Sequence, residues 1–192
     1  MDQREAEDLI AGAVGEVGGV WADFGAGAGT FTRALRALVP RESRIYAVDN
    51  DPAAVRALQE LGSGVIPVRT DFSRTFDVPE PLDGMLLANA LHFVRDKEGV
   101  LRRLVNLLRP GGRVVIVEYD RRAASRWVPY PINPAAWPKL AQSAGLENPR
   151  ITARRPSMYA GELYSGVAER LPDYRERLKN CAPLTFPGGI SP

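Results

Sequence analysis

The stretch VWADFGAGAGTF, residues 20–31, places three glycines at alternate positions between an apolar run and a segment with helical spacing. The apolar run over residues 20–24 is typical of a short buried strand. A strand that turns directly into a helix brings its main chain to the carboxyl edge of a sheet, where open α/β folds bind ligands. Since glycine leaves room beside the backbone, we predict that a side chain at Gly25, Gly27 or Gly29 would occupy the space of a ligand.

Strands and helices alternate along most of the chain. The apolar patterns predict strands over residues 20–24, 44–48, 65–68, 82–88, 114–118, 150–153 and 162–168. They predict helices over residues 4–17, 31–39, 52–62, 100–108 and 135–144, with a long loop over 120–133. This order indicates an α/β fold: a doubly wound, mostly parallel sheet with helices on both faces.

Composition limits the classes of function. The 192 residues suit one domain, expected over residues 1–170, with a mobile Pro- and Gly-rich tail over 171–192. The chain has 25 basic and 23 acidic residues, a balance that gives no support for a nucleic acid partner. A single cysteine, Cys181, forms no internal disulfide, and neither a basic leader nor an apolar run of membrane length is present. We expect a cytoplasmic protein that binds no membrane, and no metal site is predicted.

Two carboxylates follow the predicted second and third strands. Asp49 lies roughly 20 residues beyond the glycines, the offset at which an acidic side chain in a doubly wound sheet reaches a ribose diol. Asp71 ends the next strand at the same edge. The third glycine comes one residue too early for the dinucleotide fingerprint, and an anionic row repels a diphosphate. A neutral or cationic ligand is therefore favoured over a dinucleotide, while a glycine turn without any ligand stays an alternative.

Five ordered motifs make the sequence resemble the class I S-adenosylmethionine-dependent methyltransferases, in particular those that act on small molecules. The motifs are VWADFGAGAGTFTRAL, IYAVDNDPAAV, TDF, LDGMLLANALHFV and LLRPGGRVVIVEYD, and the resemblance covers about residues 5–168. It implies a Rossmann-like fold with seven strands, the last antiparallel. It also implies S-adenosylmethionine as the cofactor.

The resemblance assigns cofactor roles to particular positions. The methionine part is expected at Asp23 and along the backbone of Gly25, Ala26, Gly27 and Gly29. The ribose is expected at Asp49 with Asn50 beside it, the adenine amino group at Asp71 and the main chain of Phe72, and the sulfonium end above Asn89.

Two features of the sequence differ from those of other methyltransferases and narrow the expected reaction. After the fourth strand stands NALH, residues 89–92, in place of the Asn/Asp-Pro-Pro-aromatic tetrapeptide of enzymes that methylate exocyclic amines of bases or glutamine amides. The single cysteine, Cys181, belongs to the C-terminal tail, so direct in-line transfer is expected in place of a thiolate adduct. A base for the acceptor proton is expected in His92, since histidine titrates near neutrality, with Tyr119 and Asp120 as alternatives. His92 as a packing residue beside Asn89 remains the competing interpretation.

The irregular stretch 121–137 is expected to select the acceptor. Its flat apolar rings and guanidinium groups suit an aromatic or carboxylate-bearing small molecule, with Arg126, Trp127 and Tyr130 as the predicted contacts. The same mixture occurs in surfaces that stack single-stranded RNA, which the balanced charge argues against. A cofactor-binding protein without catalysis and an NAD-dependent oxidoreductase remain alternative functions. The sequence predicts no oligomeric state.

Overall fold

The computed structural model describes residues 1–74, 77–121, 123–157 and 161–171. Within these residues the strands are β1 (Val20–Phe24), β2 (Arg44–Asp49), β3 (Val65–Arg69), β4 (Leu82–Ala88), β5 (Leu108–Tyr119), β6 (Leu146–Pro156) and β7 (Glu162–Arg170). The helices are α1 (Gln3–Val14), α2 (Thr30–Leu38), α3 (Pro52–Gln59), α4 (Lys97–Val105) and α5 (Trp137–Ser143), with a 3₁₀ turn over Leu91–Phe93.

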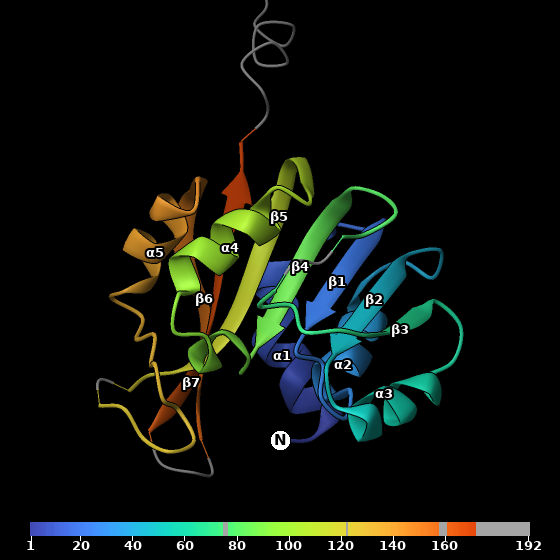
Figure 1. Ribbon diagram of the computed structural model, residues 1–192, viewed down its shortest axis with the longest axis horizontal. Coiled ribbons are helices and arrows are strands. Elements are labelled where there is room, and N and C mark those ends of the chain that lie inside the picture. Colours follow the sequence, from blue (N-terminus) through green and yellow to red (C-terminus); the bar gives the residue numbers. More distant parts are fainter. Residues whose placement is uncertain (75–76, 122, 158–160, 172–192) are drawn as a thin grey trace, which may run out of the picture.

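The strands form one sheet in the order β3-β2-β1-β4-β5-β7-β6 (Figure 1). β1 to β5 are parallel to one another, and β7 inserts antiparallel between β5 and β6. The strand order reverses between β1 and β4, and ligands bind at such a switch point in open α/β sheets. The predicted fold class is therefore confirmed, including the antiparallel last strand.

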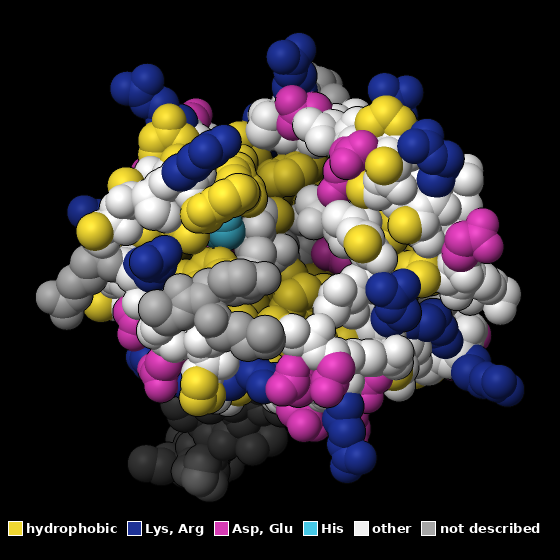
Figure 2. Space-filling view, turned by 90° about the horizontal axis from the view of Figure 1, so that it is seen from below, with side chains coloured by type: hydrophobic (Ala, Val, Ile, Leu, Met, Phe, Trp, Pro, Cys, Tyr) yellow, Lys and Arg dark blue, Asp and Glu magenta, His cyan; other side chains and the backbone are white. Residues whose placement is uncertain are grey.

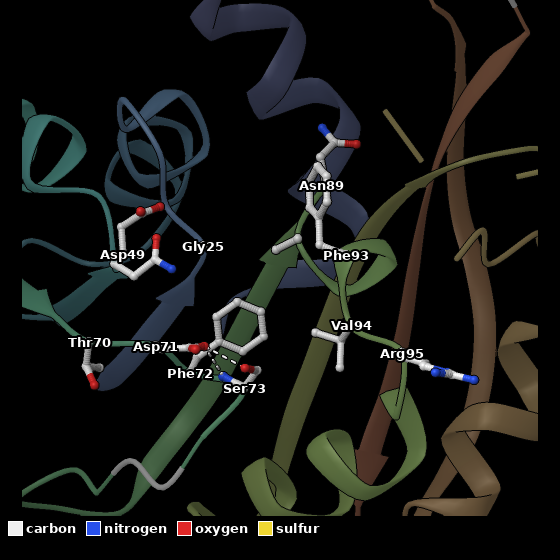
Figure 3. A pocket seen from close by; sticks show the side chains of 12 residues that line it. Gly25, Asp49, Thr70, Asp71, Phe72, Ser73, Asn89, Phe93, Val94 and Arg95 are labelled. Carbon is white, nitrogen blue, oxygen red and sulfur yellow. Dashed lines mark hydrogen bonds between the residues drawn. The ribbon is translucent and has the colours of Figure 1, made fainter. Parts of the chain in front are cut away.

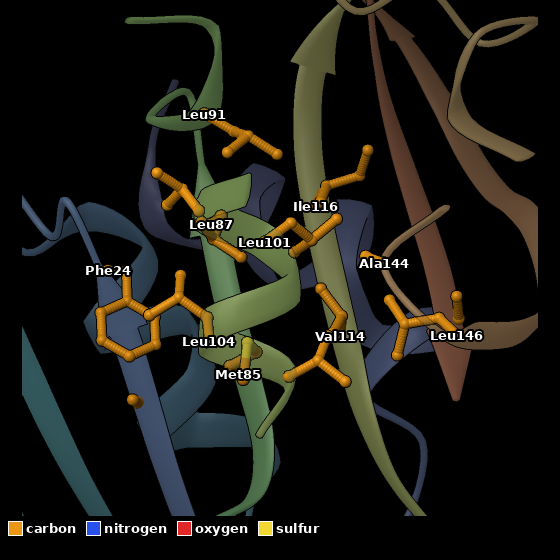
Figure 4. Packing of buried hydrophobic residues seen from close by; sticks show 14 of the residues in the cluster. Phe24, Met85, Leu87, Leu91, Leu101, Leu104, Val114, Ile116, Ala144 and Leu146 are labelled. Atoms are coloured by element: carbon orange, nitrogen blue, oxygen red, sulfur yellow. The ribbon is translucent and has the colours of Figure 1, made fainter. Parts of the chain in front are cut away.

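Helices cover both faces of the sheet because successive strand residues alternate between two apolar cores. Trp21, Ile45 and Leu86 face the side covered by α1 and α2. Phe24 and Leu87 face the opposite side, where leucines of α4 pack against β4 and β5 (Figure 4).

Capping side chains fix where several helices begin. Asp2 and Glu5 form a reciprocal capping box at the start of α1, and Asp51 accepts a hydrogen bond from Ala53 N in front of Pro52. Asp96 accepts from Gly99 N, so α4 begins at Lys97, three residues before the predicted start.

The RPGG stretch was expected to terminate this helix, but residues 109–112 belong to the start of β5. The helix ends at Val105, and Leu108 is already paired with Leu82 of β4. The apolar residues Val105 and Leu108, which look like one helical face, are buried on a helix and a strand respectively.

The two edges of the sheet differ in length and composition. Among the described residues, β3 pairs only with β2 and carries Pro67 opposite Ala47. β6 pairs only with β7, runs well beyond the predicted residues 150–153, and has a register irregularity between Glu147 and Arg150.

No helix in the described ranges is both long and apolar enough to cross a membrane. The tail expected over residues 171–192 lies outside the described residues from position 172 onward, and Cys181 with it.

Candidate functional site

A cavity of about 470 Å³ opens at the carboxyl ends of β1, β2, β3 and β4. The residues that line it are Gly25, Asp49, Asn50, Thr70, Asp71, Phe72, Ser73, Asn89, Ala90, Phe93, Val94 and Arg95. Figure 3 shows Asp49 and Asp71 on one side of this cavity, with Asn89 and Phe93 across from them. Its volume lies in the usual range for small-molecule and cofactor sites, about 300–1,000 Å³. We call it the first cavity.

The three glycines of the β1–α2 turn have different surroundings. A Cβ added at Gly27 would meet no protein atom within 4 Å, whereas one at Gly25 would come 2.6 Å from Ala90 Cβ. At Gly29 it would lie 2.8 Å from Leu61 Cδ1. Gly25 and Gly29 are thus explained by close packing, and the expectation that glycine leaves space for a ligand fits Gly27. Ala26 is buried in the same turn.

Asp49 ties the glycine turn to the end of β2. Its Oδ2 accepts a hydrogen bond from Gly27 N at 2.8 Å, and its Oδ1 accepts one from Asp51 N at 2.9 Å. Each carboxylate oxygen keeps a lone pair for a further donor. Two donors hold the side chain in place, so it can receive a diol without reordering. Asn50 lies beside it on the lining of the first cavity.

Asp71 and Phe72 contribute to the same lining as Asp49. The Asp71 Oδ1 atom accepts from both the backbone N and the hydroxyl of Ser73, at 2.9 and 2.6 Å (Figure 3). These bonds to Ser73, with Arg74 nearby, hold the pKa of Asp71 below its usual value. The carboxylate is therefore ionised and able to accept a hydrogen bond from an amino group.

Asp23 is completely buried behind the turn. Its Oδ2 accepts from the Thr32 hydroxyl at 2.6 Å, while its Oδ1 has no hydrogen-bond partner. Burial raises the pKa of Asp23 to about 7, and the neighbouring Asp49 charge adds to the increase. An unpartnered buried carboxylate oxygen is costly, so this atom fits a site for a cationic group of a ligand.

A second cavity of about 680 Å³ adjoins the first, and the two share Asn89 and Phe93. The second cavity is lined by Asn89, His92, Phe93, Tyr119, Arg121, Ser125, Trp127 and Val128. Asn89 has a left-handed backbone (φ 53°), and its Oδ1 is buried without a partner. Such strained positions cluster at functional sites. Asn89 therefore lies at the junction of two ligand-sized spaces.

His92 is held at the second cavity by a buried carboxylate. Glu118 Oε2 lies 2.5 Å from His92 Nδ1, and Oε1 accepts from His92 N at 3.1 Å. Both side chains are buried, and burial raises the pKa of Glu118 while the contact with His92 opposes the increase. Because Glu118 occupies Nδ1, Nε2 is the ring nitrogen left for a ligand; Figure 2 shows the histidine side chain inside a hollow on this face.

Glu118 was missed by the sequence reasoning. A carboxylate inside the apolar run VVIVE is the signal that could have found it, since a buried charge requires a partner.

The other two predicted catalytic residues, Tyr119 and Asp120, lie in different places, and only Tyr119 lines a cavity. Tyr119 lines the second cavity together with His92. Asp120 lines neither cavity and pairs with Arg154 Nη1 at 3.0 Å, so the structure does not bring it to the site. Its backbone N–H pairs with Glu162 O of β7, which turns it toward the β6–β7 hairpin.

Of the three predicted acceptor contacts, only Trp127 lines the second cavity. The Arg126 guanidinium lies 5.5 Å from the centre of the Trp127 ring and is not part of the lining. Tyr130 lies under Lys97 Nζ at 5.2 Å, and its backbone N–H donates to His92 O. Arg126 and Tyr130 therefore flank the cavity.

Comparisons with known proteins address the same region. Residues 22–114 match the family model of the methyltransferase domain. This part of the chain is similar to the methyltransferase domain. The resemblance to class I S-adenosylmethionine-dependent methyltransferases is thereby confirmed. The matched residues include the glycine turn, the ends of β2 and β3, and the 3₁₀ turn that holds His92.

Curated relatives of the methyltransferase domain come from Geobacillus. An uncharacterized methyltransferase of Geobacillus sp. strain WCH70 is 27% identical over 126 residues, which cover 62% of this chain and 58% of the relative. One from Geobacillus kaustophilus is 26% identical over 113 residues, covering 57% and 51%. The chain thus spans a little over half the length of these relatives.

Solved structures share the fold. The 1,6-didemethyltoxoflavin-N1-methyltransferase of Burkholderia thailandensis, solved with 1,6-didemethyltoxoflavin and S-adenosylhomocysteine, is 25% identical with a TM-score of 0.70, over 88% of this chain and 78% of that one. The N-methyltransferase NodS of Bradyrhizobium japonicum has a TM-score of 0.69 at 20% identity, over 88% and 86% of the two chains. The similarity to NodS shows a shared fold only.

Proposed function

We propose that this chain transfers a methyl group from S-adenosylmethionine, bound in the first cavity, to a small molecule bound in the second. The observation that carries the proposal is that the two cavities adjoin at Asn89 and Phe93, so that two ligands would meet there. S-adenosylmethionine supplies a methyl group already activated on a positively charged sulfur.

Residues of the first cavity, together with Asp23 and Gly27 at the neighbouring glycine turn, fit the parts of that cofactor. Asp49, fixed by Gly27 N and Asp51 N, is placed to accept the ribose hydroxyls. Asp71 and the main chain of Phe72 suit the adenine amino group and ring. The free Oδ1 of Asp23 fits the methionine ammonium, and the open space at Gly27 fits the methionine chain.

The chain's own part in the reaction is positioning and proton removal. Holding the two reactants in line supplies up to about 7–11 kcal/mol of barrier reduction. We assign His92 Nε2 as the base that accepts the proton of an acceptor O–H or N–H, because Glu118 binds Nδ1 and stabilises the imidazolium that forms. Tyr119, on the same lining, is the alternative base. The methyl group then passes to the acceptor atom by direct in-line displacement.

Titration calorimetry tests the cofactor half of this proposal. S-adenosylhomocysteine should bind to the full chain, and Asp49→Ala should weaken it at least about tenfold, since each hydrogen bond to a charged group contributes about 1.5–3 kcal/mol. Asp51→Ala is the matched control, because it removes a neighbouring carboxylate that caps α3 and does not line the cavity.

A turnover assay that detects S-adenosylhomocysteine release from a small-molecule panel tests the second half. Binding without turnover on any acceptor would favour a non-catalytic cofactor-binding protein. Binding of NADH in place of S-adenosylhomocysteine would overturn the cofactor assignment.

A further inference from the structure

The second cavity has two large aromatic walls that are unusually exposed. Phe93 is 57% exposed and Trp127 is 73% exposed, and both contribute to the same lining. Figure 2 shows hydrophobic side chains gathered around the hollow of this face, with basic side chains at its rim. Exposed apolar surface that is concentrated at one cavity marks a binding site for an apolar ligand. Aromatic rings add a preference for a flat ring that stacks on them or meets their edges.

Arg121 brings an uncommitted positive charge to this lining. It is partly buried, and its side chain has no hydrogen-bond or ionic partner among the described residues. Arg154, by contrast, binds both Asp120 and Glu162. A guanidinium fork next to apolar walls is suited to a carboxylate, which it binds with two parallel hydrogen bonds.

The buried His92 side chain sets the third requirement. His92 presents its Nε2 to the second cavity, backed by Glu118, and an acidic O–H or N–H is the group that this nitrogen can deprotonate. Asn89 lies beside it at the opening to the first cavity. The reacting atom therefore belongs at the His92 end, with the charged group of the acceptor at Arg121.

We infer that the methyl acceptor is a flat aromatic carboxylate whose ring also carries an acidic hydroxyl or N–H group. This inference rests on the proposed function. Phe93 and Trp127 contact the ring, Arg121 binds the carboxylate, and His92 takes the proton from the atom that receives the methyl group. In the transfer, His92 accepts the proton, and the electron pair of the O–H or N–H bond stays on the acceptor atom. That atom forms the new bond to the methyl carbon while the electron pair of the S–CH3 bond leaves with sulfur.

Fluorescence titration of the full chain with hydroxynaphthoates tests the inference. The probes are 1-, 3- and 6-hydroxy-2-naphthoate, which vary the distance between the hydroxyl and the carboxylate, added with S-adenosylhomocysteine at saturation. At least one acid should bind about tenfold tighter than its methyl ester, the difference expected for one charge-assisted pair. Its ring-saturated analogue should bind more weakly as well.

Two arginine variants test whether Arg121 is the residue that binds the carboxylate of the acceptor. Arg121→Gln should weaken the acid about tenfold and leave the methyl ester within about twofold. Arg126→Gln is the matched control, since it removes the same charge from the same loop outside the lining. It should leave both probes within about threefold, and unchanged S-adenosylhomocysteine affinity shows that each variant is folded.

The contrary outcomes are distinct. Equal affinity for acid and ester, or equal losses in both arginine variants, would overturn the assignment of the anion to Arg121. Equal affinity for the saturated analogue would overturn the aromatic requirement. If S-adenosylhomocysteine binds and none of the naphthoates does, the acceptor class is wrong while the proposed function stands; if S-adenosylhomocysteine itself does not bind, the proposed function fails.

Discussion

Asp23→Asn should make the protein more stable at neutral pH and at the same time a poorer binder of the cofactor. Burial raises the pKa of Asp23 from 3.8 to about 7, so the folded state holds the proton more tightly than the unfolded state. Stability from this group is therefore greatest below pH 4, falls as the pH rises to about 7, and is constant above that. The ionised form opposes folding at pH 8.

The magnitude follows from the two pKa values. Their difference of about 3, at 1.36 kcal/mol for each pKa unit, corresponds to about 4 kcal/mol of lost stability at pH 8. Asparagine keeps an acceptor for Thr32 but places an unpartnered amide at the Oδ1 position, which costs about 1–3 kcal/mol. The net gain at pH 8 is about 1–3 kcal/mol, and it should shrink by about 3 kcal/mol at pH 5, where Asp23 is already protonated.

Urea unfolding of both proteins between pH 5 and pH 8 measures this difference directly. Asp8→Asn, a change at an exposed carboxylate of α1, is the control and should shift stability by no more than about 0.5 kcal/mol at any pH. Calorimetry should show S-adenosylhomocysteine affinity reduced about tenfold in Asp23→Asn, because the ammonium loses its anionic partner. A stability difference that stays the same from pH 5 to pH 8 would refute the reasoning.

Three further changes separate the parts of the site. Gly27→Ala should abolish cofactor binding in calorimetry and cost only about 1–2 kcal/mol of stability, because the residue has a positive φ. Gly62→Ala is the control, since Gly62 has a positive φ and equally open surroundings outside the site. It should cost as much stability and leave cofactor binding unchanged. Glu118→Gln should lower kcat about tenfold or more, because the imidazolium formed in proton transfer loses its carboxylate partner; an unchanged kcat would make Glu118 a packing residue. Trp127→Ala should raise KM for the acceptor in steady-state assays and leave the cofactor Kd within about threefold, and the reverse pattern would place Trp127 in the cofactor site.

The sequence was sufficient for the order of strands and helices because buried parallel strands are short apolar runs with clear turn signals. β1 and β4 have the predicted bounds, Val20–Phe24 and Leu82–Ala88. The start of β5 was not predictable, since Leu108 joins the sheet through pairing with Leu82, and local pattern carries no information on that contact. The start of α4 was placed three residues too late for a different reason, because the helix begins at the local Asp96 cap and not at the first apolar residue, Val100.

The site was predictable where chain order alone decides position. Asp49 and Asp71 end adjacent parallel strands and line one cavity. The other site positions depend on contacts between distant segments. Gly25 has no side chain because Ala90 packs against it, and Asp120 forms an ion pair with Arg154 and does not line a cavity. These contacts join residues more than 30 positions apart, which no spacing rule reaches. The roles of the lining residues in binding and catalysis stay predictions.

The composition of the two edge strands has a consequence for how copies of this domain meet. Pro67 removes a backbone donor from β3, where the partner strand β2 is on one side only. On β6, Pro149 falls in the register irregularity and Arg150 and Arg154 add charge. Prolines, bulges and charged side chains at edges oppose the addition of a foreign strand. In the part of the chain that the structure describes, both edges of the sheet therefore oppose elongation, and growth of a continuous intermolecular sheet is disfavoured.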